Sequence, residues 1–483
     1  MDAGRTSKLD GSLGVRSVVF MVVAAAAPLT VIAGAVPVGI ALGNGAGFPA
    51  TFMVCCAILT LFAVGFCAMT RHVPHAGAFY AYVQQGLGRV TGLGSAFLAL
   101  AAYTAVQLAV YGYLGATLRE LVTHYGGPGL PWPLYAFAAL GLVAVLGYRH
   151  IELSSRVLGV LLVCEVGIVL VFDLVVTVRG GDSGPSTAPL HLSEIGSGSP
   201  GIGIMFAIAS FLGFEATAVF RDEARDPERT VPRATYLALL LIGGFYALSS
   251  WALVSAWGDR KAVAEAGSDP AGMLIASVTR YLGGTGGDLV RILLATSLFA
   301  ALLSFHNVVA RYVFSLGRSS ALPAAWGRCH PRHGSPYRAS LAQSAGALVL
   351  LAVFVTAGLD PVSQVFAWMA GTATLGVLVL MSLTCLSVIV FFRRTRADTR
   401  PWHTLVAPLL GLAGLCGCLV LTVSNFPLLI GGSTALAVAI ETVLATFFAS
   451  GVVLAKLRRD AARTTGHHPE PHDPTPRELE ELA

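Results

Sequence analysis

Runs of about 20 apolar residues, separated by short polar loops, repeat along almost the whole chain, and a helix of that length crosses the hydrocarbon core of a bilayer. Twelve runs are predicted to span the membrane: 18–42, 48–70, 93–118, 132–148, 156–178, 200–220, 233–257, 287–316, 338–358, 362–392, 403–425 and 430–455. A short interfacial helix is expected over 271–283. The pattern predicts an all-α integral membrane protein with about 12 transmembrane helices.

The composition agrees with this fold class. Of the 483 residues, 55% are hydrophobic and 12% are charged, whereas soluble domains carry about 25% charged residues. The polar ends are an N-terminal arm (1–17) and a proline-rich tail (456–483) that is expected to be disordered. The first apolar run is too long for a signal peptide, so we interpret it as the first spanning helix.

Lysine and arginine are distributed unequally between the two sets of loops. If the N-terminus is cytoplasmic, 25 of the 31 basic residues fall on its side of the membrane and 6 on the other. Basic residues concentrate in cytoplasmic loops. We therefore expect a multi-pass protein of the cytoplasmic membrane with both termini in the cytoplasm. The net charge of +5 then reflects topology, and no nucleic-acid partner is expected.

Residue types that bind metals or perform catalysis show no recognisable constellation. The eight cysteines lack the spacing of a disulfide framework or a zinc site, and His467, His468 and His472 lie in the polar tail without ligand geometry. No metal ligand and no catalytic residue is predicted. An ATP-driven pump is disfavoured because the chain has no GxxxxGK[ST] loop.

Two predicted helices are interrupted at corresponding places. The first holds Pro28, Gly34 and Pro37, and the sixth holds Gly213 and Glu215 near its middle. Proline and glycine free backbone groups that must find other partners inside a membrane. The two interruptions lie five positions apart in the series of spans, so an inverted repeat is predicted. Interrupted helices in matching positions point to a midplane substrate site. The predicted division is a first repeat over 18–178, a second repeat over 200–392 and two extra helices over 403–455.

Three stretches carry a resemblance to a known family. They are Gly213-Phe214-Glu215 followed by EARDPERTVPRA (223–234), PHAGAFYAYVQQGLGRVTG (74–92) and HNVVARYVFSLGRSSALP (306–323). Their residues, and their order along the chain, resemble the amino acid–polyamine–organocation superfamily, in particular bacterial amino acid permeases. The resemblance implies a 5+5 inverted-repeat (LeuT-like) fold within an 18–455 transporter domain. It also implies alternating access and an amino acid, polyamine or other organocation as substrate.

The resemblance also implies where the substrate binds. In the family, the amino and carboxylate groups of the substrate meet backbone atoms at the breaks of helices 1 and 6. Carried onto this chain, the helix-6 residues are Ala209, Ser210, Phe211, Leu212 and Gly213. The helix-1 candidates are Pro28, Leu29 and Thr30, with Gly34 one turn further on; the position of this break stays open.

Side chains on other helices are further candidates. Phe305 matches a position where the family closes its site with an aromatic residue, and Trp368 is a second gate candidate. Tyr103 and Gln107 lie one helical turn apart, so both can face the same cavity. His306 and Asn307 are costly on a lipid face and are therefore expected to face protein or cavity.

Two acids lie inside predicted spans. Glu165 is near the middle of 156–178, where some family members carry a lysine. An intramembrane carboxyl is costly unless it faces the interior and serves a function, so proton coupling is the first interpretation of Glu165. A cation site, with sodium as the second choice of coupling ion, and a structural hydrogen bond to helix 1 or 8 are the alternatives. Glu215 is interpreted as a gating or coupling residue or as a helix-to-helix bond, whereas Asp173 is interpreted as structural.

These features together predict a secondary transporter, with proton symport as the first choice and obligate exchange as the alternative. No cofactor is expected. A polytopic membrane enzyme or a sensor is the alternative from a different class. The chain has no HExxH motif, nucleophile elbow or soluble output domain to support it. Besides substrate, the expected partners are membrane lipid and, in a homodimer, a second copy; a monomer is equally compatible.

Overall fold

The computed structural model describes residues 14–73, 79–149, 155–215, 217, 224–318, 321–330 and 335–464. The first half holds α1 (Val15–Ala25), α2 (Pro28–Thr30), η1 (Val31–Ala35), α3 (Val36–Leu42), η2 (Gly45–Gly47), α4 (Phe48–Thr70), α5 (Phe79–Leu87), α6 (Arg89–His124), α7 (Trp132–Tyr148), α8 (Ser155–Arg179), η3 (Ala188–Leu190) and α9 (Leu192–Ile195). The second half holds α10 (Pro200–Ser210), α12 (Pro227–Trp257), α13 (Asp259–Ser268), α14 (Met273–Arg318), η5 (Ala324–Gly327), α15 (Tyr337–Thr356), η6 (Pro361–Phe366), α16 (Ala367–Thr395), η7 (Trp402–Val406), α17 (Ala407–Leu429) and α18 (Thr434–Thr464).

Most of the described chain is helical and apolar, which confirms the predicted fold class. Ten helical segments in it are long and apolar enough to cross a membrane, and the shorter apolar helices α7 and α10 occupy the fourth and sixth predicted spans. The number of twelve spans stays a prediction, as does the division into two repeats. The N-terminal arm up to residue 13 and the tail from residue 465 lie outside the described residues.

Proline sets the beginning of several helices. It occupies the first or second position of α4, α7, α10 and α12, where its missing N–H removes no helical hydrogen bond. The π-helical turn η6 begins differently, because Asp360 Oδ1 accepts hydrogen bonds from the backbone N–H groups of Val362 (3.0 Å) and Ser363 (2.7 Å). The expected helix over 271–283 forms the first turns of α14, which kinks at Gly283 (φ 81°).

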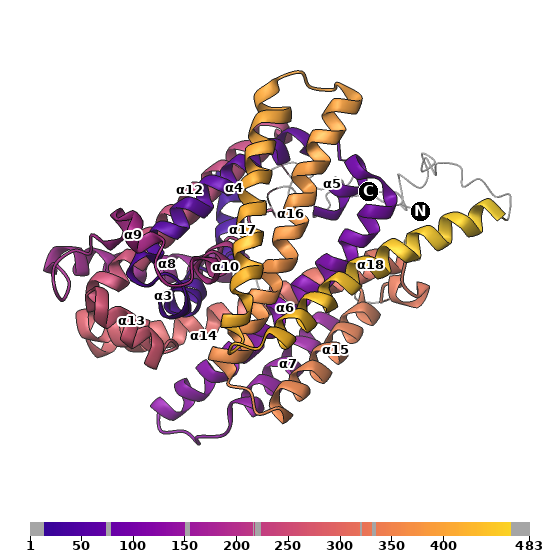
Figure 1. Cartoon of the computed structure of the whole chain (residues 1–483). Coiled ribbons are helices and arrows are strands. Elements are labelled where there is room, and N and C mark those ends of the chain that lie inside the picture. The colour runs from indigo at the N-terminus through magenta and orange to yellow at the C-terminus, as the bar shows by residue number, and fades with distance from the viewer. Residues whose placement is uncertain are drawn as a thin grey trace, which may run out of the picture.

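The long helix α6 lies at the centre of the bundle. It packs against α18, α14, α16, α5 and α7, and Figure 1 shows it running beneath α16 and α17. Small residues permit close approach: Gly112 of α6 lies against Pro361 and Val365, and Gly94 lies against Phe448. Close packing of this kind holds helices together in a membrane, where lipid is as apolar as the side chains.

The outer surface of the bundle is apolar at the level of the spans. Large exposed apolar side chains include Val163, Leu170 and Leu174 of α8, Leu348, Val349 and Val353 of α15, and Leu409, Leu410 and Val420 of α17. A contiguous apolar surface of this kind suits contact with lipid. Figure 1 shows α9 and α13 gathered at one end of the molecule, away from both marked chain ends.

Candidate functional site

The first helix breaks immediately before Pro28. Ala27, between α1 and α2, adopts a left-handed conformation (φ 46°, ψ 67°), which is strained for a residue with a Cβ. The hydroxyl of Tyr246 on α12 donates a 3.2 Å hydrogen bond to the carbonyl of Ala26 and so satisfies a group that the break frees. Among the predicted candidates, the Pro28–Thr30 region is thus the one next to the break.

Gly34 lies one turn further on, within the π-helical turn η1, and serves close packing. A Cβ at this position would lie 2.6 Å from Cε1 of Tyr113 and 3.3 Å from Cζ of Phe366, so only glycine fits without movement of these rings.

The sixth span breaks after Ser210, where α10 ends and residues 211–215 form turns. Gly213 has φ 107°, a conformation that glycine adopts without steric cost. Its N–H donates a 2.9 Å hydrogen bond to Glu215 Oε2. The residues carried over from the family therefore lie on both sides of an interruption in the helix.

A cavity of about 80 Å³ lies between the two breaks. Its lining comes from both broken helices and from α6, α14 and α16 with η6: Ala26, Ala27, Thr30, Val31, Ala35, Val106, Ala109, Val110, Phe206, Ala209, Ser210, Leu212, Ala301, Phe305, Phe366, Ala370 and Ala373. Only Thr30 and Ser210 contribute polar side chains. The cavity thus has an apolar wall, and its polar character comes from the two interrupted backbones.

Aromatic side chains flank the cavity on two sides. On one side the ring of Phe366 lies 5.1 Å from that of Tyr113 and 6.4 Å from that of Phe206. On the other side the ring of Tyr103 lies 6.5 Å from that of Phe305. Tyr103 precedes and Tyr113 follows the lining segment of α6, so the two groups lie on opposite sides along the helix axis.

The predicted side-chain lining is partly different from the observed one. Phe305 lines the cavity, but Tyr103 and Gln107 do not, and Val106 and Val110 take that place. Residues 103 and 107 share one face of α6, while 106 and 110 share the neighbouring face. The face that carries the polar side chains turns toward other helices.

Of the backbone candidates, Thr30, Ala209, Ser210 and Leu212 line the cavity, while Pro28, Leu29, Gly34, Phe211 and Gly213 do not. The side chains of Leu29 (0% exposed) and Phe211 (1%) are buried in the core. The ring of Phe211 lies near those of Phe52 and Tyr246 instead.

The second aromatic gate candidate, Trp368, is half-buried on α16 and is not among the lining residues. Phe366 lines the cavity, and residues two positions apart in a helix point in nearly opposite directions. The aromatic side chain that the tenth span offers to the cavity is therefore Phe366. No local feature of the sequence distinguishes the two aromatic residues.

Glu165 is connected to the first break by hydrogen bonds. It is 4% exposed, and its Oε2 accepts a 2.9 Å bond from Ser297 Oγ on α14. Thr30 Oγ1 in turn donates to Ser297 Oγ over 3.3 Å. The acid thus lies one serine away from a residue that lines the cavity.

Glu215 forms the corresponding contact at the second break. It is 6% exposed and accepts a 2.7 Å hydrogen bond from the hydroxyl of Tyr103. The ring of Tyr103 lies 5.6 Å from that of Tyr312, which belongs to α14. Glu215 therefore ties the end of α10 to α6, next to the aromatic group around Phe305.

His306 belongs to a separate buried network. It is fully buried, and its ring nitrogens lie 3.3 Å from Gln107 Nε2 and 2.8 Å from Ser340 Oγ. Gln343 Nε2 donates to Gln107 Oε1 over 2.6 Å. These bonds join α6, α14 and α15. The adjacent Asn307 is half-buried. The His306 side chain thus faces other helices of the bundle.

The charged stretch after Glu215 is described only in part. Residues 218–223 lie outside the described residues. Within the described part, Arg229 Nε lies 3.8 Å from Asp226 Oδ2, and both side chains are exposed. Such a pair contributes little to stability.

Comparison with known proteins gives a consistent assignment. A family model described as amino acid permease matches residues 13–449. An uncharacterized transporter of Rhizobium meliloti is 28% identical over 56% of this chain and 58% of its own length. The branched-chain amino acid permease BcaP of Lactococcus lactis is 23% identical over 77% of this chain and 81% of its own. The low-affinity putrescine importer PlaP of Escherichia coli is 24% identical over 65% of this chain and 69% of its own.

Proposed function

The chain belongs to the amino acid permease family, and from that premise we propose that it imports an amino acid by alternating access, as a proton-coupled secondary transporter of the cytoplasmic membrane. The observation that carries the proposal is the cavity between two broken helices, with Glu165 one hydrogen-bonded serine away from its wall. Substrate binding and proton binding thus act on the same segment of helix 1.

The helix ends at the cavity suit the charged groups of an amino acid. The C-terminal end of α10 has negative dipole character near Ser210, which favours an ammonium group. The N-terminal end of α2 presents positive dipole character near Pro28, which favours a carboxylate. An α-amino acid carries both groups on adjacent carbon atoms.

The wall of the cavity favours an apolar substrate side chain. Its eight alanines and the rings of Phe206, Phe305 and Phe366 offer no charged partner. A polyamine would leave its second ammonium against this wall, at the cost of an unpaired charge. Glu165 and Glu215 do not line the cavity. We therefore propose an amino acid with an apolar side chain rather than a polyamine.

The surroundings of Glu165 support a proton as the coupling ion. Its Oε2 atom accepts a hydrogen bond from the hydroxyl of Ser297, a donor that suits a carboxylate. A sodium ion would instead need several acceptor oxygens turned toward it. Protonation of Glu165 would remove the negative charge that strengthens this hydrogen bond, and so free helix 1 to move.

Uptake into proteoliposomes tests the substrate class. A panel of radiolabelled apolar, cationic and acidic amino acids and putrescine is offered at equal concentration, with empty liposomes as control. The proposal predicts saturable uptake of apolar amino acids that unlabelled apolar amino acids suppress. Uptake of putrescine alone would contradict the proposed substrate, and uptake that requires internal amino acid would indicate an exchanger.

A further inference from the structure

A second cavity of about 370 Å³ lies far from the first, where α4 ends and α12 and η7 begin. Its polar wall carries Arg71, Arg229, Arg400 and His403 against one acidic residue, Glu228. Its apolar wall includes Val64, Ala68, Val231 and Tyr236. We name it the arginine pocket. By the predicted topology, it opens on the cytoplasmic face.

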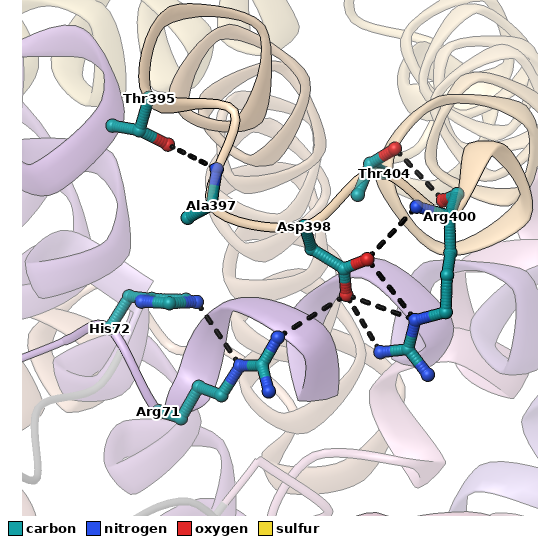
Figure 2. A network of polar contacts seen from close by, with 7 residues as sticks. All are labelled: Arg71, His72, Thr395, Ala397, Asp398, Arg400 and Thr404. Atoms are coloured by element: carbon teal, nitrogen blue, oxygen red, sulfur yellow. Dashed lines mark hydrogen bonds and ion pairs between the residues drawn. The ribbon is translucent and has the colours of Figure 1, made fainter.

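Figure 2 shows how two of these arginines are held. The carboxylate of Asp398 lies between the two guanidinium groups, 3.4 Å from Arg71 Nη2 and 2.7 Å from Arg400 Nη2. The Asp398 side chain is only 4% exposed, while those of Arg71 and Arg400 are 38% and 58% exposed. One buried acid thus holds two cations together, and the more exposed one, Arg400, lines the pocket.

Other features of the pocket also favour an anion. The N-terminus of the 31-residue helix α12 lies in its wall at Pro227 and Glu228. Helix N-termini carry positive dipole character and free N–H groups. The Nδ1 atom of His403 is buried and has no hydrogen-bond partner among the described residues. Buried polar atoms without partners call for one.

The position of the pocket indicates the source of the anion. Trp402 precedes His403 and is 49% exposed, as expected of a tryptophan at the level of lipid headgroups. Exposed leucines of α12 (Leu237, Leu240) and of α17 (Leu409, Leu410) flank α4, which packs against both helices. An acyl chain fits along such a surface below a headgroup bound by arginine.

We propose that the arginine pocket binds a phosphate group, supplied by the headgroup of an anionic phospholipid. Basic pockets between spanning helices are suited to anionic headgroups because charge and depth in the membrane match together. The site is separate from the substrate cavity, so the proposal does not depend on which amino acid is carried.

Native mass spectrometry of the full-length protein tests the proposal. Phosphatidylglycerol or phosphatidylcholine is titrated into detergent-solubilised wild type, Arg229→Gln, Arg400→Gln and the control Arg394→Gln. Arg394 is an exposed arginine at the end of α16 that does not line the pocket. Arg229 forms an exposed 3.8 Å ion pair with Asp226, so Arg229→Gln should leave the fold intact. This variant keeps the test valid if Arg400→Gln unfolds the protein.

We expect wild type to retain phosphatidylglycerol over phosphatidylcholine. Each pocket variant should bind phosphatidylglycerol about fivefold more weakly, which corresponds to ~1 kcal/mol per basic residue, and Arg394→Gln should bind as wild type. A parallel arm measures thermal shift with inorganic phosphate. Stabilisation by phosphate without a phosphatidylglycerol preference, lost in Arg229→Gln, would support the same site with free phosphate as its ligand. Equal binding by all four proteins, or no binding of either ligand, would overturn the proposal.

Discussion

The hydroxyl of Tyr103 donates a 2.7 Å hydrogen bond to Glu215 and thereby ties the central helix α6 to the break after α10. The only other bond to this carboxyl among the described residues comes from the N–H of Gly213, two residues earlier in the chain. Tyr103 thus provides the contact that holds the second break against a different helix.

The change Tyr103→Phe should destabilise the protein by about 1–3 kcal/mol, because it leaves a buried carboxyl with one partner fewer. Thermal unfolding in detergent measures the effect. Tyr113→Phe is the matched control on the same helix, since the Tyr113 hydroxyl is buried and has no hydrogen-bond partner among the described residues. It should be neutral or slightly stabilising. Equal losses of stability in both variants would show that the surroundings of the ring, and not the hydrogen bond to Glu215, determine the effect.

Gly34→Ala should lower both stability and uptake. The added Cβ would meet Tyr113 Cε1 at 2.6 Å and force the aromatic group beside the cavity to move, at a cost of about 1–3 kcal/mol. Gly167→Ala on α8 is the control, because no atom lies within 4 Å of a Cβ there. It should be neutral or stabilising by up to about 1 kcal/mol, as alanine favours helix. A harmless Gly34→Ala would contradict the packing described here.

Filling the substrate cavity should weaken substrate binding without unfolding the protein. Ala209→Leu adds three carbon atoms to the wall of a cavity of about 80 Å³. We expect the KM for uptake to rise at least about tenfold, which is ~1.4 kcal/mol of lost binding. Ala138→Leu, on an exposed position of α7, should leave uptake unchanged. Unchanged uptake by folded Ala209→Leu would place the substrate elsewhere.

The contacts of Asp398 predict an acid-dependent loss of stability. Hydrogen bonds from Arg400, with the charge of Arg71, hold the pKa of Asp398 well below its usual range. A carboxyl with a lowered folded-state pKa stabilises fully above the unfolded value of about 3.9, and this stabilisation is lost as the pH falls below that value.

Asp398→Asn should therefore lower the melting temperature at pH 7, by about 1 kcal/mol of stability, and the difference from wild type should shrink below pH 4. Asp226→Asn, whose ion pair is exposed and 3.8 Å long, should have no such effect. A difference that is constant down to pH 3 would contradict the assignment of Asp398 as the charged partner.

Features that depend on the local chain were predictable from sequence. Pro28 and Gly213 marked the two breaks because their backbone limits are intrinsic to proline and glycine. The apolar runs predicted the spans because hydrophobicity and length are also properties of the local sequence. The helix α5, amphipathic and only nine residues long, was not predicted as an element.

Features that depend on helix rotation were not predictable. The sequence analysis named Gln107 as a candidate lining residue and Trp368 as a gate candidate, whereas Val106 and Phe366 line the cavity. The spacing within one helix does not say which of its faces meets a given neighbour. Ser297, which links Glu165 to Thr30, was missed because its role exists only where three helices meet.

Uptake of an apolar amino acid into proteoliposomes, with and without an inward proton gradient, tests the role of Glu165 most directly. Wild type is compared with Glu165→Gln and with Asp173→Asn, a second buried acid on α8 that bonds to Ser249 over 2.7 Å. We predict that the gradient drives uptake by wild type and Asp173→Asn, whereas Glu165→Gln binds substrate but does not respond to the gradient. A gradient response retained in Glu165→Gln would contradict proton coupling through this residue.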